Sequence, residues 1–244
     1  MHIARFRDPS GYVRTGEWNA GSIDTGSEIY NAEAVTLLPP SDPTKVICQA
    51  GGYMDHREES GLDDLPDRPE LFVKTPNCVV GPGEAVELPP GRDVIEFEGE
   101  FGIVISDQCR DVSENDAMDV VEGFTCVNDI SNRDDQQEER NWVRGKAFDA
   151  SLPMGPVLAT PDEVPEDAKL ELRHNGEIKQ ESSREMMIFT VEELVSEVSE
   201  LITLEPGDVI ASGTPYGPDQ IHEGDTVEVE FEGVGTLENH VTTR

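Results

Sequence analysis

A β-rich α+β fold with few helices is predicted by three features of this sequence. Short apolar runs alternate with turn residues over long stretches, as in "GPGEAVELPPGRDVIEFEGEFGIVI". The pair Asn175-Gly176 separates two strand patterns, and Asn-Gly accepts the positive φ angles of a type I′ hairpin turn. Apolar residues follow helical spacing in few segments. Many strands with few helices are typical of the α+β class.

The chain is expected to begin with a small β-rich lead-in over residues 1–42, which ends at the Pro-rich connector "LLPPSDPTK". Residues 43–244 are expected to form the larger, second domain. A helix is predicted over Ser113–Phe124, where Ser113 can cap, acidic residues fill the first turn and Gly123 can stop it. The strongest helix signal is "FTVEELVSEVSELI", in which Thr190 and Glu193 form a capping box. The segment "GDTVEVEFEGVGTLENHV" closes the chain as a second hairpin.

The composition is strongly acidic. The 244 residues include 52 Asp and Glu against 18 Lys and Arg, which gives a formal net charge of −34. Nucleic acid is excluded as a partner, because phosphate binding needs clustered positive charge. The acidic residues are dispersed among periodic apolar segments, which argues against disorder. We therefore expect a halophilic protein, in which molar salt screens the repulsion between its carboxylates.

The four cysteines and the N-terminus suggest a reduced compartment. The cysteines are far apart and form no CxxC pair, so neither a zinc site nor a disulfide framework is expected. The segment "MHIARFRDPSG" lacks the apolar core of a signal peptide, and no apolar run approaches the length of a membrane span. We expect a cytoplasmic protein with no membrane partner.

Three glutamates lie within the strand pattern "VIEFEGEFGIVIS". Side chains two positions apart on a strand point to the same face, so Glu96, Glu98 and Glu100 share one face, opposite the apolar residues. A row of carboxylates facing a cleft suits a hard divalent cation such as Mg²⁺. An acidic face exposed to solvent is the alternative, and the pattern alone leaves both open. Asp129, at the end of a later strand, could supply a third oxygen ligand.

Two further segments contain candidate functional groups. In "GFTCVNDISNRDDQ", Arg133, Asp134 and Gln136 open a short predicted helix, and in "WVRGKAFDASLPMGP" Lys146 has apolar neighbours. Taken alone, Arg133 and Asp134 are compatible with a surface ion pair, and Lys146 with a lysine that extends its amine to solvent.

Taken together, these segments resemble the fumarylacetoacetate hydrolase family. The motifs "EGE", "NDISNRDDQ", "GKAFDASLPMGP" and "PGDVIASGTP" occur in the family's order, from about residue 45 to the C-terminus. The resemblance implies that residues 43–244 form a catalytic domain, a mixed β-sandwich roll. It also implies a homodimer.

The resemblance assigns roles residue by residue. The metal ligands would be Glu98, Glu100 and Asp129, holding Mg²⁺, with Mn²⁺ or Ca²⁺ as alternatives. Lys146 would contact the substrate oxygens, Arg133 and Gln136 would line the same pocket, and Thr214 would hold a substrate carboxylate. The segment "YMDHREE" matches a lid in which His56 and Glu59 form a water-activating dyad, with Tyr53 nearby.

The expected function is metal-dependent hydrolysis of a C–C bond in an acylpyruvate-type 2,4-dioxo acid, through a metal-stabilised enolate. His56 would serve as the base, and Lys146 as an electrostatic stabiliser. The same site in the family also supports oxaloacetate decarboxylation, isomerisation or decarboxylation of hydroxymuconate-type diacids, and dehydration of 2-oxo-3-deoxy sugar acids. A non-enzymatic metal-binding protein is the alternative from another class.

Three positions depart from the family pattern. Gly52 stands where Asn often precedes the lid tyrosine, Ala147 where Ser usually follows the Gly-Lys pair, and Asn132 where Ala is common before Arg-Asp. None of these changes removes a ligand, but each is expected to affect the lid or the choice of substrate.

The acidic composition leads to a prediction about salt. The melting temperature should rise between low salt and molar KCl, because counter-ions screen repulsion among the 52 carboxylates. Differential scanning calorimetry over a KCl series measures this shift. A melting temperature that does not rise with KCl would contradict adaptation to high salt.

Overall fold

The computed structural model describes residues 1–19, 21–59, 61 and 64–243 and confirms a β-rich α+β fold. The described residues contain four α-helices: α1 (Met54–Glu59), α2 (Arg133–Glu138), α3 (Val143–Lys146) and α4 (Val191–Leu201). None of the helices in these residues is long and apolar enough to cross a membrane.

A twelve-stranded mixed sheet forms the larger layer. Its central order is β4-β3-β2-β1-β14-β12-β11-β17-β6-β7, while β5 pairs with β1 and β8 with β14. Its strands are β1 (His2–Arg7), β2 (Val13–Asn19), β3 (Ser22–Asp24), β4 (Ile29–Asn31), β5 (Thr36–Leu37), β6 (Val46–Ala50), β7 (Glu70–Lys74), β8 (Val79–Val80), β11 (Gly99–Ile105), β12 (Val121–Asn128), β14 (Leu152–Ala159) and β17 (Val209–Ala211).

Two smaller sheets complete the fold. The five-stranded sheet has the order β16-β15-β18-β19-β9, and β10 pairs with β13 in the third sheet. Their strands are β9 (Ala85–Leu88), β10 (Ile95–Glu96), β13 (Ser131–Asn132), β15 (Lys169–His174), β16 (Glu177–Ser183), β18 (Thr226–Phe231) and β19 (Gly235–Thr243). Asn175 and Gly176 turn between β15 and β16 with φ angles of 52° and 80°, which confirms the predicted hairpin.

The main core lies between the two large sheets. Strand β11 is buried along its whole length, and its apolar residues alternate between two hydrophobic clusters. Phe101 contacts Phe124 of β12 and Phe231 of β18, with ring centroids 4.6 and 4.7 Å apart. Both faces of β11 are therefore covered, so the polar side chains on this strand are forced into the interior.

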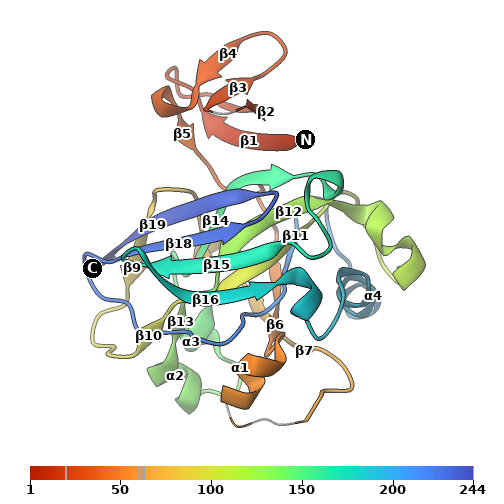
Figure 1. The fold of residues 1–244 in the computed structure, drawn as a ribbon, viewed down its shortest axis with the longest axis vertical. Coiled ribbons are helices and arrows are strands. Elements are labelled where there is room, and N and C mark those ends of the chain that lie inside the picture. The colour runs from red at the N-terminus through yellow and green to blue at the C-terminus, as the bar shows by residue number, and fades with distance from the viewer. Residues whose placement is uncertain (20, 60, 62–63, 244) are drawn as a thin grey trace.

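The N-terminal strands extend the large sheet at one end. In Figure 1, β2–β5 lie above the rest of the molecule, away from α1 and α2. Strand β1 pairs with β14 through His2–Ala159 and Ile3–Leu158. The division of the chain into residues 1–42 and 43–244 stays a prediction.

The two predicted helices have different outcomes. Helix α4 has the expected capping box, in which the Thr190 hydroxyl accepts from the Glu193 amide and the Glu193 carboxylate accepts from the Thr190 amide. The helix predicted over Ser113–Phe124 is confirmed in part, because the structure has a shorter helix with Ser113 at its N-cap position. Residues Glu114–Val120 form a 3₁₀ helix, and the following residues enter β12. Pairing with β11 and burial of Phe124 in the core override the local helical signal.

Asp208 joins β17 to the segment before β6. Its buried carboxylate accepts hydrogen bonds from the amides of Thr44, Lys45 and Glu205 at 2.8–3.1 Å and also binds the Lys45 ammonium. Burial alone would raise the pKa of Asp208, but these donors hold it below its ordinary value. The carboxylate therefore stabilises the start of the parallel pair β17–β6.

We expect Asp208→Asn to lower the free energy of unfolding by about 2–4 kcal/mol, since it removes one partner of a buried pair. Because the folded pKa is depressed, this stabilisation is present above the unfolded pKa and lost as pH falls through the folded pKa. Guanidinium unfolding at pH 7 and pH 3 should show a smaller wild-type-to-variant difference at pH 3 than at pH 7. Asp42→Asn, at an exposed ion pair, is the control. Equal differences at both pH values would contradict this role.

Candidate active site

A cavity of about 320 Å³ lies where the start of β11 meets α1, α2 and α3. Its lining includes His56 from α1, Glu98 and Glu100 from around the start of β11, Arg133 from α2 and Lys146 from α3. This volume is in the range of sites for small molecules. The structure thus brings together in one cavity residues that are up to 165 positions apart in the sequence, from Gln49 to Thr214.

Glu98 and Glu100 enter this cavity where the chain passes from the small sheet that contains β10 to the large sheet that contains β11. The predicted continuous strand is divided into β10 and β11, with Phe97 and Glu98 between them. Phe97 and Phe101 point into the main core, so Glu98 and Glu100 point the other way. Both glutamates are buried, with 4% and 1% exposure.

Hydrogen bonds hold Asp129 directly beside Glu98. Its amide donates to the Glu98 carbonyl at 2.8 Å, and the Asn128 side-chain oxygen accepts from the Glu98 amide at 3.0 Å. Glu98, Glu100 and Asp129 each offer a carboxylate oxygen, and these three oxygens lie within 4.8 Å of one another. The backbone therefore holds the three carboxylates together, whatever their charges.

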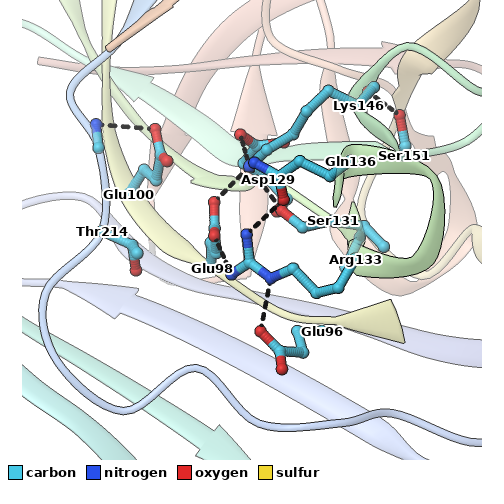
Figure 2. A network of polar contacts seen from close by, with 12 residues as sticks. Glu96, Glu98, Glu100, Asp129, Ser131, Arg133, Gln136, Lys146, Ser151 and Thr214 are labelled. Atoms are coloured by element: carbon cyan, nitrogen blue, oxygen red, sulfur yellow. Dashed lines mark hydrogen bonds and ion pairs between the residues drawn. The ribbon is translucent and has the colours of Figure 1, made fainter. Parts of the chain in front are cut away.

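Two cationic side chains partly balance these carboxylates (Figure 2). The Lys146 ammonium lies 2.6 Å from Glu98 and 2.8 Å from Asp129, and it donates to the Ser131 hydroxyl at 2.5 Å. Arg133 donates to Glu98 and, at 2.7 Å, to Glu96. Glu96 therefore takes part in an ion pair beside the three carboxylates and not in the group itself.

Neighbouring charges shift the pKa values of Glu98 and Glu100 in opposite directions. Burial acts to raise the pKa of Glu98, but Lys146 and Arg133 outweigh it and hold that pKa below its ordinary value. Burial, together with the charges of Asp129 and Glu98, raises the pKa of Glu100 well above its ordinary value. Burial would lower the pKa of Lys146, yet Asp129 and Glu98 raise it, so the ammonium stays charged.

Glu100 shows that this site fits a cation. It accepts one hydrogen bond, from the Gly213 amide at 3.0 Å, and forms no ion pair with any residue that the structure describes. A buried carboxylate without a cationic partner is costly. Three buried oxygen donors of this kind are the ligands that hard divalent cations prefer.

His56 and Glu59 form the predicted pair on α1. The His56 Nδ1 lies 3.2 Å from a Glu59 carboxylate oxygen, and His56 lines the cavity whereas Glu59 is not among its lining residues. The same Glu59 oxygen lies 3.5 Å from the Gly217 amide, on the loop after Thr214. A carboxylate on Nδ1 fixes the imidazole tautomer with Nε2 as the free acceptor, which suits a general base.

The remaining predicted residues have different positions. Gln136 lines the cavity and accepts from Arg133 at 2.8 Å. Thr214 also lines it, but its hydroxyl donates to the Gly99 carbonyl and accepts from Gln180. Tyr53 is buried and is not among the lining residues. The substrate-binding roles of Tyr53 and Thr214 stay predictions, and the Thr214 hydroxyl is already engaged.

Sequence reasoning missed Lys74. This lysine is completely buried, and its ammonium lies 2.6 Å from the second Asp129 oxygen and donates to the Ser151 carbonyl at 2.6 Å. Asp129 is thus held between two lysines. The signal was a lysine that ends the apolar strand "ELFVK" in a chain with only five lysines.

Two departures from the family pattern have structural explanations. A Cβ at Gly52 would lie 2.0 Å from the Ser212 carbonyl oxygen. The backbone before the lid therefore approaches Ser212 more closely than a residue with a side chain would allow. Asn132 caps α2, because its side chain accepts from the Asp135 amide and donates to the Asp135 carboxylate. Nothing in the structure gives Ala147 a comparable role.

Comparison with known proteins shows which proteins this chain is similar to. Residues 45–242 match the family described as fumarylacetoacetate (FAA) hydrolase C-terminal. The oxaloacetate tautomerase YisK of Bacillus subtilis is 38% identical over 239 residues, which cover 92% of this chain and 79% of that protein.

Solved structures share the whole fold. A 5-carboxymethyl-2-hydroxymuconate delta-isomerase from Mycobacterium smegmatis superimposes with a TM-score of 0.92 at 34% identity, covering 100% of this chain and 99% of that one. A maleylpyruvate hydrolase from Sphingobium sp. SYK-6, in complex with manganese(II) and pyruvate, gives 0.83 at 25% identity, with coverage of 100% and 99%.

The unpaired state of Glu100 leads to a prediction. Glu100→Gln should abolish the rise in melting temperature caused by Mg²⁺ or Mn²⁺, because it removes one anionic ligand. The metal-free variant should be more stable than the metal-free wild type by about 1–3 kcal/mol, since the cost of burying this carboxyl, either as a charge or as an acid that takes up a proton on folding, is gone. Thermal unfolding with EDTA and with each metal measures both effects.

Glu96→Gln is the matched control, because Glu96 belongs to the ion pair with Arg133 and not to the triad. It should keep the metal-induced shift. A Glu100→Gln variant that is still stabilised by either metal would contradict the assignment of the triad.

Proposed function

The chain belongs to the fumarylacetoacetate hydrolase family, and on this premise we propose that it is a divalent-metal-dependent enzyme acting on 2-oxo acids. Specifically, we propose that it hydrolyses a C–C bond in an acylpyruvate-type 2,4-dioxo acid. The observation that carries the proposal is that the His56–Glu59 pair and the three carboxylates belong to the same site, with His56, Glu98 and Glu100 lining one cavity.

The proposed metal is Mg²⁺, held by Glu98, Glu100 and Asp129, with Mn²⁺ or Ca²⁺ as alternatives. Oxygen-only ligands favour these hard cations over zinc. When bound, the cation would supply Lewis-acid chemistry at the 2-oxo carbonyl. The manganese in the related maleylpyruvate hydrolase supports a divalent cation at this site.

Lys146 contributes the fixed positive charge. Its pKa is raised, so it remains protonated while it faces the Glu98 and Asp129 carboxylates. Phe72 lies beside it, with the ammonium 5.1 Å from the ring centroid. A charge held in this buried, partly apolar setting stabilises negative charge that develops on the substrate oxygens more than a solvated lysine would.

His56 would act on water. With Nδ1 directed at Glu59, its other nitrogen takes a proton from a water molecule that adds to the carbonyl two carbons from the 2-oxo group. The bond between the two carbonyl-bearing halves then breaks, and its electrons pass to the 2-oxo acid half, which takes up the proton held by His56 and leaves as the enol of pyruvate. The other half, which has gained the hydroxyl group of the water, leaves as a carboxylic acid.

Proton transfer without hydrolysis is the second candidate function. Relatives that favour it are the Bacillus subtilis oxaloacetate tautomerase, at 38% identity, and the Mycobacterium smegmatis isomerase, at 34% identity. The same groups serve it, because His56 would then exchange a proton with the carbon next to the 2-oxo group. In hydrolysis, by contrast, His56 acts on a water molecule, and a C–C bond of the substrate breaks.

Parallel assays in molar KCl with Mg²⁺ test these candidates. Pyruvate release from acetylpyruvate and fumarylpyruvate, lowered about 10²–10⁴-fold in kcat by His56→Ala, would support hydrolysis with His56 as base. Glu59→Gln should show a smaller loss. Loss of the enol absorbance of oxaloacetate without pyruvate release would instead support the tautomerase.

Two results would contradict the wider proposal. One is full activity after treatment with EDTA, which would remove the metal from the reaction. The other is the absence of turnover with all three 2-oxo acids, which would leave a metal-binding protein without this chemistry.

A further inference from the structure

Arg57 differs from the other cationic residues of the cavity. Lys146 and Arg133 are both paired with carboxylates, and His56 faces Glu59. Arg57 lines the same cavity and is only partly exposed, yet no carboxylate of the described residues lies within ion-pair distance of it. In a chain with 52 acidic residues, a guanidinium that has no carboxylate partner among the described residues is unusual beside an active site.

The contacts of Arg57 position it without neutralising it. One terminal nitrogen donates to the Asp64 carbonyl at 3.2 Å, while the Nε is buried without an acceptor. The side chain lies against Gly51, where an added Cβ would be 3.0 Å from its Cγ and 3.1 Å from its Nη1. Glu70 also lines the cavity but forms no ion pair with Arg57.

Gln49 is a second unsatisfied polar group of the same cavity. It lines the cavity at the end of β6 and is 2% exposed. Neither its amide nitrogen nor its amide oxygen has a hydrogen-bond partner. Buried amides are nearly always bonded, so two unsatisfied donors on residues that line the same cavity point to a ligand group that completes them.

We propose that Arg57, assisted by Gln49, binds an anionic group at the end of the substrate remote from its 2-oxo carboxylate. Arg57 is thus the residue that selects 2-oxo dicarboxylic acids over 2-oxo monocarboxylic acids. This inference rests on the proposed function, in which the 2-oxo carboxylate end lies at Glu98, Glu100 and Lys146. Those groups are committed to that end of the cavity, so a second carboxylate needs a separate cation, and a guanidinium can bind it through two parallel hydrogen bonds.

A pair of stable ligands isolates this interaction. N-Oxalylglycine presents an oxalyl group to the metal site and a carboxylate at its other end. N-Isobutyloxamate has the same oxalyl group and the same shape, with two methyl groups in place of the remote carboxylate oxygens. Calorimetric titration of the Mg²⁺-loaded, full-length protein in molar KCl gives the affinity for each ligand.

The wild type should bind N-oxalylglycine about tenfold or more tightly than N-isobutyloxamate, as expected for a charge-assisted pair. Arg57→Met should remove this preference and leave the affinity for N-isobutyloxamate within about twofold of the wild type. Arg57→Lys should restore part of the preference, because it keeps the charge but not the planar fork.

Arg68→Met is the matched control, since Arg68 is exposed on the segment after α1 and does not line the cavity. It should keep the full preference. A preference that persists in Arg57→Met, or is absent in the wild type, would overturn the assignment of Arg57. Failure of both ligands to bind the Mg²⁺-loaded wild type would instead contradict the proposed function on which it rests.

Discussion

Repulsion among three buried carboxylates is the constraint around which the site is organised. Backbone hydrogen bonds at the facing ends of β11 and β12 keep Glu98, Glu100 and Asp129 next to one another, which limits how far their carboxylates can separate to relieve it. Burial removes the water that would otherwise screen them. The surrounding structure must therefore provide positive charge at this point.

The chain supplies that charge unevenly. Asp129 has two lysines, and Glu98 has a lysine and an arginine, whereas the described residues give Glu100 only a backbone amide. The remaining imbalance lies on the side of Glu100 that faces the cavity. This imbalance supports the proposed divalent cation on electrostatic grounds, independently of any resemblance to other proteins.

Features encoded locally could be predicted from the sequence. The Asn175-Gly176 turn and the Thr190–Glu193 capping box depend on residues next to each other in the chain, and the structure contains both. The ordered motifs indicated the family, which the match over residues 45–242 shows. Placement of the site in one cavity followed from those motifs, and not from periodicity.

Features that depend on distant partners could not be predicted. Val121–Phe124 join β12 because β11 and β14 lie on either side, a condition that no local pattern reports. Lys74 reads as the polar end of a strand until Asp129, 55 positions later, is placed against it. Arg57 likewise resembles any charged residue of an acidic loop until the unpaired state of its guanidinium is seen.

The cationic cluster at the cavity has a kinetic consequence for an acidic protein. A net charge of −34 surrounds the molecule with a negative potential that slows the approach of any anion in dilute buffer. Together with the proposed divalent cation, Arg57, Arg133 and Lys146 offset the carboxylates of the cavity and attract an anion only at short range, once it has crossed that barrier. In molar salt the Debye length shrinks to about 3 Å, so the long-range barrier disappears while the buried cluster keeps its effect. Salt would thus accelerate encounter with a small anion, the reverse of its usual effect on electrostatically steered association.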